Sequence, residues 1–170
     1  AQGLDINLDV YASGIKDALS GTNPQLSQEE IQKTVSELQK RMMAARQKEL
    51  KEMTAKNLAT GKAFLEENKK KEGVKTLTSG LQYKVLVEGS GKTPKATDNV
   101  TVNYKGTLIN GSEFDNSYKR GNPTTFQLGK VIKGWTEALQ LMKEGSKWQL
   151  FIPPELGYGE RGAGPVPPNS

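Results

Sequence analysis

The chain has 170 residues with 24 lysines and arginines against 19 aspartates and glutamates, so its formal charge at neutral pH is +5. Histidine and cysteine are both absent, which excludes zinc sites built on them, cysteine nucleophiles and serine–histidine triads. Its apolar stretches are only a few residues long, whereas a transmembrane helix needs about 20 apolar residues. We therefore expect a chain without a transmembrane segment, a metal site or a cofactor.

A long helix is predicted over residues 27–71. This stretch contains no proline and a single glycine, and most of its residues are strong helix formers. Ser27 followed by Glu30 is a capping box at the start, and three lysines followed by Gly73 are typical of a helix end.

The charges of this helix are interleaved along its length. Acidic residues precede basic ones by four positions, as in Glu29 with Lys33 and Glu37 with Arg41, which is the favourable order for ion pairs on a helix. A nucleic-acid-binding helix would carry an unopposed basic stripe. We therefore predict a solvated face and no nucleic-acid partner.

Apolar residues in the first half of the helix are spaced four and three apart, which is typical of a seam that packs on another helix. The other helical candidate in the first half of the chain, residues 9–19, is short, so we predict self-association through this seam; burial within the same chain is the alternative. Glu49 and Glu52 interrupt the seam, so we expect the second half of the helix to stand in water. The seam comprises Ile31, Val35, Leu38, Met42 and Ala45.

After Gly73 the apolar period changes from helical to alternating, which predicts β-strands. Asn110-Gly111 is a strong hairpin signal between two of them. The pattern predicts an α+β fold, an antiparallel sheet with one short helix laid on it, and two domains, 1–73 and 74–170. The expected strands cover 81–87, 100–104, 124–128 and 148–152, and the expected short helix covers 131–142.

Four motifs in the second half, together with their spacing, resemble the signature of the FKBP-type peptidyl-prolyl cis-trans isomerases. The long helix ending in residues 61–65 and the entry at 80–83 resemble the macrophage infectivity potentiator type, bacterial proteins that dimerise through N-terminal helices. The four motifs are Tyr104-Lys105-Gly106-Thr107-Leu108, Phe114-Asp115-Asn116-Ser117 after Gly111, Val131-Ile132-Lys133-Gly134-Trp135 and Pro154-Glu155-Leu156-Gly157-Tyr158-Gly159.

The resemblance implies a half-barrel sheet wrapped on the short helix, with an apolar pocket between them and Trp135 as its floor. It implies catalytic roles for Asp115, for the hydroxyl of Tyr158 and for the backbone N–H of Ile132. Arg120 would hold the Asp115 carboxylate; a purely structural ion pair between these two is the alternative. The substrate-binding set implied is Tyr104, Phe114, Arg120, Phe126, Val131 and Trp135.

Such a pocket accounts for catalysis without a nucleophile. Amide resonance gives the X-Pro bond a rotation barrier of about 18–20 kcal/mol, and it separates charge. Transfer from water into an aromatic pocket weakens that resonance and favours the twisted transition state. The implied activity is isomerisation of X-Pro bonds in protein substrates, with chaperone activity beside it and inhibition by macrolides of the FK506 and rapamycin type. A non-catalytic holdase that binds unfolded chains in the cleft of a dimer is the alternative.

Two further expectations concern the ends and the location of the chain. The family's domain adds a long apolar strand after the element that matches 167–170, so we predict that the native chain continues. The family also opens with another helix before the segment that matches 9–19. The resemblance implies a homodimer in the periplasm, outer membrane or surface of a bacterium.

Overall fold

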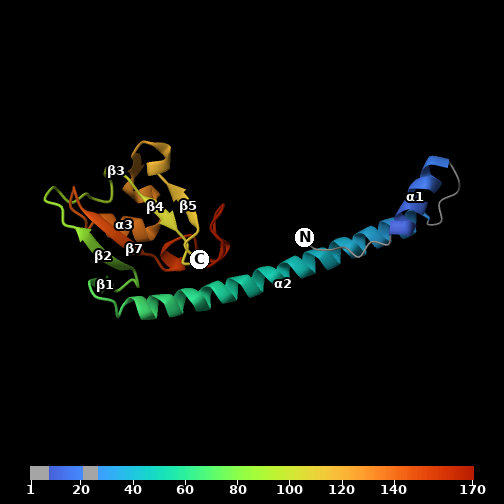
Figure 1. Cartoon of the computed structure of the whole chain (residues 1–170), viewed down its shortest axis with the longest axis horizontal. Coiled ribbons are helices and arrows are strands. Elements are labelled where there is room, and N and C mark those ends of the chain that lie inside the picture. The colour runs from blue at the N-terminus through green and yellow to red at the C-terminus, as the bar shows by residue number, and fades with distance from the viewer. Residues whose placement is uncertain (1–7, 21–26) are drawn as a thin grey trace. The chain divides into compact units, whose positions relative to one another are not determined.

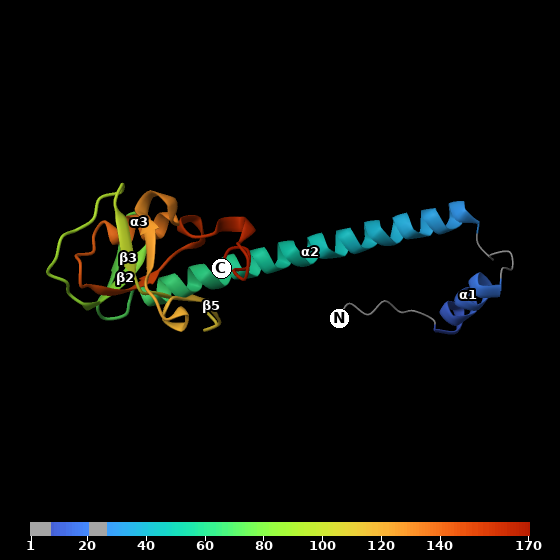
Figure 2. The ribbon, with the colours of Figure 1, turned by 90° about the horizontal axis from the view of Figure 1, so that it is seen from above.

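A computed structural model describes residues 8–20 and 27–170 of the chain. The described residues fall into two compact units that divide between Lys48 and Glu49, and each unit is described by itself below. Figures 1 and 2 show the ribbon in two orientations. Among the described helices, none is both long and apolar enough to cross a bilayer.

The first unit is helical. Helix α1 covers Leu8–Ser20, and α2 runs without a break over Gln28–Asn68, so it supplies residues to both units. The predicted capping box is confirmed: the Ser27 N–H donates to the Glu30 carboxylate at 2.8 Å, and the Glu30 N–H donates to Ser27 Oγ at 3.3 Å. The side chains of the predicted seam at positions 31, 35, 38 and 42 are 39% to 47% exposed.

Helix α2 ends three residues before the predicted end, at Asn68. The lysines at 69–71 form turns that hydrogen-bond back to residues 65, 67 and 68. Gly73 follows with φ of 78°, a left-handed conformation that glycine adopts without strain. The long helix is therefore confirmed, with its last turn loosened.

The expectation that the second half of α2 stands in water is wrong for residues 54–68. Gly61 and Asn68 are buried, and the centroids of the Phe64 and Phe151 rings are 5.9 Å apart. The Gln82 side chain donates to the Leu65 carbonyl at 2.8 Å. Positions 57, 61, 64, 65 and 68 share one face of the helix. Only Phe64 and Leu65 on this face are large and apolar, because amide side chains stand at 57 and 68 and glycine stands at 61.

The second unit contains seven strands, all paired antiparallel. Four of them agree with the predicted strands to within two residues, and the hairpin at Asn110-Gly111 joins two more. Gly111 has φ of 85°, as this turn requires. The strand at Val74–Thr76 was not predicted. The strands are β1 (Val74–Thr76), β2 (Gln82–Val87), β3 (Asn99–Val102), β4 (Lys105–Thr107), β5 (Glu113–Asn116), β6 (Thr124–Gln127) and β7 (Lys147–Phe151).

The strands form three sheets rather than the single sheet that the alternation predicts. The orders are β1-β2-β7, β3-β6 and β4-β5, so within the described residues β7 pairs along one edge only. Helix α3 (Lys133–Leu139) lies against the strands (Figure 1) and is shorter than predicted, because residues 141 and 142 bond three positions back rather than four. The core includes Leu81, Leu128, Ala138, Leu139 and Val166.

Candidate active site

Three aromatic rings from three different elements meet beside α3. Tyr104 precedes β4, Phe126 lies in β6 and Trp135 lies in the first turn of α3. The Trp135 ring stands edge-on to both others, with centroids 5.0 Å from Tyr104 and 5.6 Å from Phe126. The ring centroids of Tyr104 and Phe126 are 5.7 Å apart. All three side chains are half-buried, so the cluster joins the core to the surface, as an apolar binding site must.

A second aromatic pair lies at the hairpin of β4 and β5. The Phe114 ring stands at 88° to that of Tyr158, with centroids 6.3 Å apart. Phe114 also packs on Gly106, where an added Cβ would lie 2.5 Å from the ring. Only glycine fits at this position. The close approach of the Phe114 ring therefore explains the glycine in the motif of residues 104–108.

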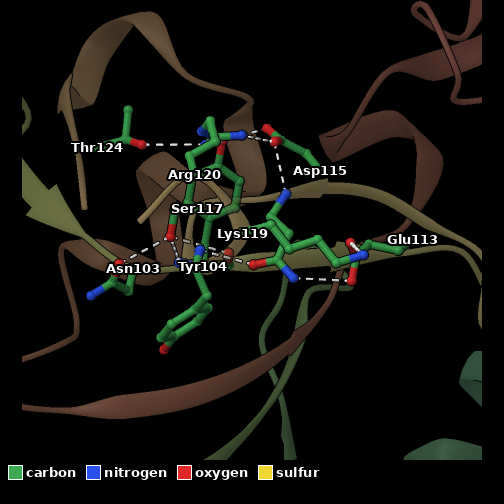
Figure 3. A network of polar contacts seen from close by, with 10 residues as sticks. Asn103, Tyr104, Glu113, Asp115, Ser117, Lys119, Arg120 and Thr124 are labelled. Atoms are coloured by element: carbon green, nitrogen blue, oxygen red, sulfur yellow. Dashed lines mark hydrogen bonds and ion pairs between the residues drawn. The ribbon is translucent and has the colours of Figure 1, made fainter. Parts of the chain in front are cut away.

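The carboxylate of Asp115 lies in a hydrogen-bonded group with Tyr104 and Arg120 (Figure 3). The Tyr104 hydroxyl donates to one carboxylate oxygen, and the Arg120 guanidinium donates to the other. Arg120 also donates to the Tyr104 hydroxyl at 2.8 Å and to Thr124 Oγ1 at 3.3 Å. The predicted contact between Asp115 and Arg120 is therefore present, and Tyr104 belongs to it.

These contacts set the charges of the group. The hydrogen bond from Tyr104, then that from Arg120, holds the pKa of the Asp115 carboxyl below its usual range. Burial, with the hydrogen bond to Asp115, raises the pKa of the Tyr104 hydroxyl. At neutral pH the site therefore presents a carboxylate anion, a neutral phenol and a guanidinium cation.

Ser117 supports the group of Tyr104, Asp115 and Arg120 through the main chain of Tyr104. Its role was not predicted, although it is the last residue of the second motif. Its side chain is fully buried. The Tyr104 N–H donates to Ser117 Oγ at 2.8 Å, and Ser117 Oγ donates to Asn103 Oδ1 at 3.1 Å. Ser117 thus extends the pairing of β4 with β5 by one residue and fixes the main chain of Tyr104.

A second ion cluster surrounds Glu113, the first residue of β5, and was also missed. Glu113 pairs with Lys119 at 2.6 Å and lies 3.6 Å from Lys105. The Asn116 side chain donates to the same carboxylate at 3.0 Å. Hydrogen bonds from Lys119 and Asn116 lower the pKa of Glu113. Each of these residues is polar and ordinary by itself, so only the fold reveals the cluster.

Val131 and Ile132 lead directly into α3 and are half-buried. Ile132 is the N-cap residue, with extended ψ of 149°, and its carbonyl accepts hydrogen bonds from Trp135 and Thr136. No hydrogen bond within residues 8–20 and 27–170 uses the Ile132 N–H. Thr136 Oγ1 donates to the Leu128 carbonyl at 2.8 Å, which fixes the start of α3 against the preceding turn.

Within the described parts of the chain, no three carboxylates converge in a way that could hold a metal ion. The groups that remain for chemistry are the aromatic cluster, the Asp115 carboxylate with its two donors and the Ile132 N–H. Together they can enclose an apolar group and orient a polar one.

Comparison with known proteins identifies this arrangement. The family described as "FKBP-type peptidyl-prolyl cis-trans isomerase" matches residues 90–170, and the "domain amino terminal to FKBP-type peptidyl-prolyl isomerase" matches residues 1–85. The chain belongs to the FKBP-type peptidyl-prolyl cis-trans isomerases, so its substrates contain proline.

Individual relatives match almost the whole chain. It is 49% identical to the outer membrane protein MIP of Legionella longbeachae, over 99% of this chain and 72% of that protein. It is 48% identical to the peptidyl-prolyl cis-trans isomerase Mip of Coxiella burnetii, over 97% of this chain and 73% of that protein. The crystal structure of FkpA from Escherichia coli superposes with a TM-score of 0.85 at 45% identity, covering 99% of this chain and 78% of that one.

These findings confirm the resemblance to the isomerase family, the α+β fold and the enzyme class. The roles of individual residues, the boundary between the domains, the dimer and the macrolide ligands stay predictions.

Proposed function

We propose that the X-Pro bond of a protein substrate is isomerised at the cluster of Tyr104, Phe126 and Trp135. The observation that carries this proposal is the meeting of the three rings directly beside the Asp115 carboxylate, which Tyr104 contacts through its hydroxyl. The rings would take the prolyl ring and the amide out of water. Loss of solvation disfavours the charge-separated planar amide, so the twisted state becomes easier to reach.

We assign the polar roles as follows. The N–H of Ile132, the N-cap residue of α3, would bind one substrate carbonyl, and the hydroxyl of Tyr158 would bind another. The Asp115 carboxylate would face the carbon of the twisting carbonyl. Each tenfold gain in rate requires about 1.4 kcal/mol of transition-state stabilisation, which one or two such contacts can supply. Phe114 and Val131 would complete the apolar walls.

The contacts of Asp115 favour catalysis over a purely holding function. A holdase needs an apolar surface, but it has no need for a carboxylate held ionised by a phenol and a guanidinium. Tyr104 and Arg120 both donate to Asp115 here, at the edge of the aromatic cluster. This arrangement supports the interpretation of the site as an isomerase active site, with chaperone action as an additional activity of the same protein.

The decisive experiment measures the rate of cis-to-trans conversion of an apolar-Pro peptide, with and without a macrolide of the FK506 or rapamycin type. We expect acceleration that the macrolide abolishes. Trp135→Leu should remove most of it, while Trp148→Leu is the matched control, because Trp148 stacks on Tyr83 at 4.3 Å and not on the cluster. Absence of acceleration in a chain that circular dichroism shows to be folded would favour the holdase.

We also propose a homodimer formed through the apolar seam of α2, with residues 1–73 as the dimerisation region and 74–170 as the isomerase domain. The exposure of Ile31, Val35, Leu38 and Met42 supports it. A location in the bacterial cell envelope, at the periplasm, outer membrane or surface, is supported by the relative named an outer membrane protein. Fractionation of the source cells tests the location.

A further inference from the structure

The hydroxyl proposed to bind substrate belongs to Tyr158, which lies in a glycine-rich segment. Glycines at 159, 162 and 164 all have φ between 54° and 65°. Glycine loses more conformational freedom on ordering than any other residue, so such a segment keeps one conformation only if contacts elsewhere hold it. Tyr158 itself is 38% exposed, and its ring stands against that of Phe114.

The contacts that hold this segment come first from residues 166–169. Ala163 and Val166 form an isolated antiparallel bridge, with N–H to carbonyl distances of 3.0 and 2.9 Å. The Asn169 N–H donates to the Gly159 carbonyl at 2.9 Å. At Gly162 an added Cβ would lie 2.3 Å from the Val166 carbonyl oxygen, so the two stretches are in close contact. The turn that follows Tyr158 therefore rests on residues 166–169.

Residues 166–169 are in turn fastened to helix α2. Asn57 Nδ2 donates to the Pro168 carbonyl at 2.8 Å and to Ser170 Oγ at 3.2 Å. In the opposite direction, Asn169 Nδ2 donates to the Thr54 carbonyl at 3.5 Å. Asn169 is 5% exposed and adopts a left-handed φ of 53°, which asparagine tolerates better than most residues. Two amide side chains thus cross between the helix and the segment.

We propose that Asn57 is a positioning residue for Tyr158. It donates to the carbonyl of the Pro168–Asn169 peptide group, and the N–H of the same peptide group donates to the Gly159 carbonyl. Gly159 directly follows Tyr158. The long helix is in this way part of the scaffold of the active site. A group that binds substrate must be held to within a fraction of an ångström, so loosening this connection lowers the rate without removing any catalytic group. This inference rests on the substrate-binding role proposed above for the Tyr158 hydroxyl.

The test is a double-mutant cycle in the full chain with Asn57→Ala and Tyr158→Phe. Thr60→Ala is the matched control, because Thr60 is exposed one turn further along α2 and both changes raise helix propensity. We expect Asn57→Ala to lower kcat/KM for an X-Pro peptide by about 3- to 10-fold. In the Tyr158→Phe background, Asn57→Ala should lower kcat/KM by less than about twofold, because the hydroxyl that Asn57 positions is already absent. Thr60→Ala should leave kcat/KM unchanged.

Amide hydrogen exchange gives a second readout that does not depend on Tyr158. In Asn57→Ala the N–H groups of Gly162, Ala163 and Val166 should exchange faster than in Thr60→Ala. If Asn57→Ala does not fold, Asn57→Ser replaces it, because serine fits a helix and its hydroxyl is too short to reach Pro168.

Three outcomes would overturn the inference, and they differ in what they leave standing. Full activity in Asn57→Ala together with a loss in Tyr158→Phe removes the positioning role and leaves the proposed function. An equal loss from Asn57→Ala in both backgrounds shows that Asn57 acts by another route. Full activity in Tyr158→Phe removes the role of that hydroxyl, and this inference with it, whereas the Trp135 test of the isomerase site is unaffected.

Discussion

The guanidinium of Arg120 contacts Tyr104 in two ways. Its Cζ lies 5.4 Å from the centre of the Tyr104 ring, and its Nη2 donates to the Tyr104 hydroxyl at 2.8 Å. Because that hydroxyl accepts from Arg120, its own proton is directed to Asp115. One side chain therefore belongs to both halves of the site: its ring lines the aromatic cluster and its hydroxyl orients the carboxylate.

The first prediction concerns the carboxylate itself. Asp115→Leu should lower kcat/KM for an apolar-Pro peptide by about tenfold or more, because the charge facing the twisting carbonyl is lost. The fold should be retained, since Arg120 is 48% exposed and its freed guanidinium can be hydrated. A peptide isomerisation assay, with circular dichroism as the test of folding, checks both statements.

The matched control for this change is Glu113→Gln. Glu113 lies two residues away on the same strand, and it pairs with Lys119 and Lys105 rather than with the site. We expect its kcat/KM to stay within about twofold of the unaltered chain. If Asp115→Leu is as active as this control, the contact between Asp115 and Arg120 is a structural ion pair only.

The second prediction concerns the pH dependence. The chain has no histidine, so kcat/KM should be flat between about pH 5 and 8. The pKa of Asp115 is lowered mainly by the Tyr104 hydrogen bond, so the carboxylate stays ionised in mild acid. Stability from this ionised group is present above the pKa of the unfolded chain and is lost as the pH falls through the lower folded pKa. Activity that needs the anion is lost over the same acidic range.

Tyr104→Phe tests this assignment. The ring contacts with Phe126 and Trp135 can remain, but the donor to Asp115 is removed, so the pKa of Asp115 should rise and the acid limb of the kcat/KM profile should move to higher pH. Thr124→Val is the control, because it removes only the 3.3 Å contact to Arg120. An acid limb that stays in place in Tyr104→Phe would mean that another group controls it.

Parts of this structure follow from local sequence and parts do not. The capping box at Ser27 and the hairpin at Gly111 are local devices, and both were predicted from neighbouring residues. The packed face of α2 was missed because Asn57, Gly61 and Asn68 are not apolar: a hydrophobic pattern does not record amide hydrogen bonds or close backbone contacts. Similarly, Ser117 acts through the main chain of a residue 13 positions away, which only the strand register brings near.

The third prediction concerns self-association. Leu38→Glu places a charge in the seam of α2, so it should shift a dimer to a monomer in light scattering at tens of micromolar. Gln39→Glu adds the same charge at the next position, off the seam, and should leave the dimer intact. Because every residue proposed to contact substrate lies in 104–158 and the positioning residue Asn57 lies well beyond the seam, kcat/KM for a short peptide should be unchanged in both variants. A monomeric unaltered chain under these conditions would contradict the dimer and the cleft it would form.

The last prediction concerns the buried amides that join α2 to β2. Gln82 and Asn68 are 3% and 1% exposed, and Gln82 Oε1 accepts from Asn68 Nδ2 at 2.9 Å. Among the described residues Asn68 Oδ1 has no hydrogen-bond partner, so Gln82→Ala would leave the whole Asn68 amide unpaired. We expect the free energy of unfolding to fall by about 1–3 kcal/mol, measured by urea denaturation. Gln149→Ala on β7, where the side chain is exposed, should cost less than about 0.5 kcal/mol. Equal losses in the two variants would show that this pair does not hold the helix to the strand.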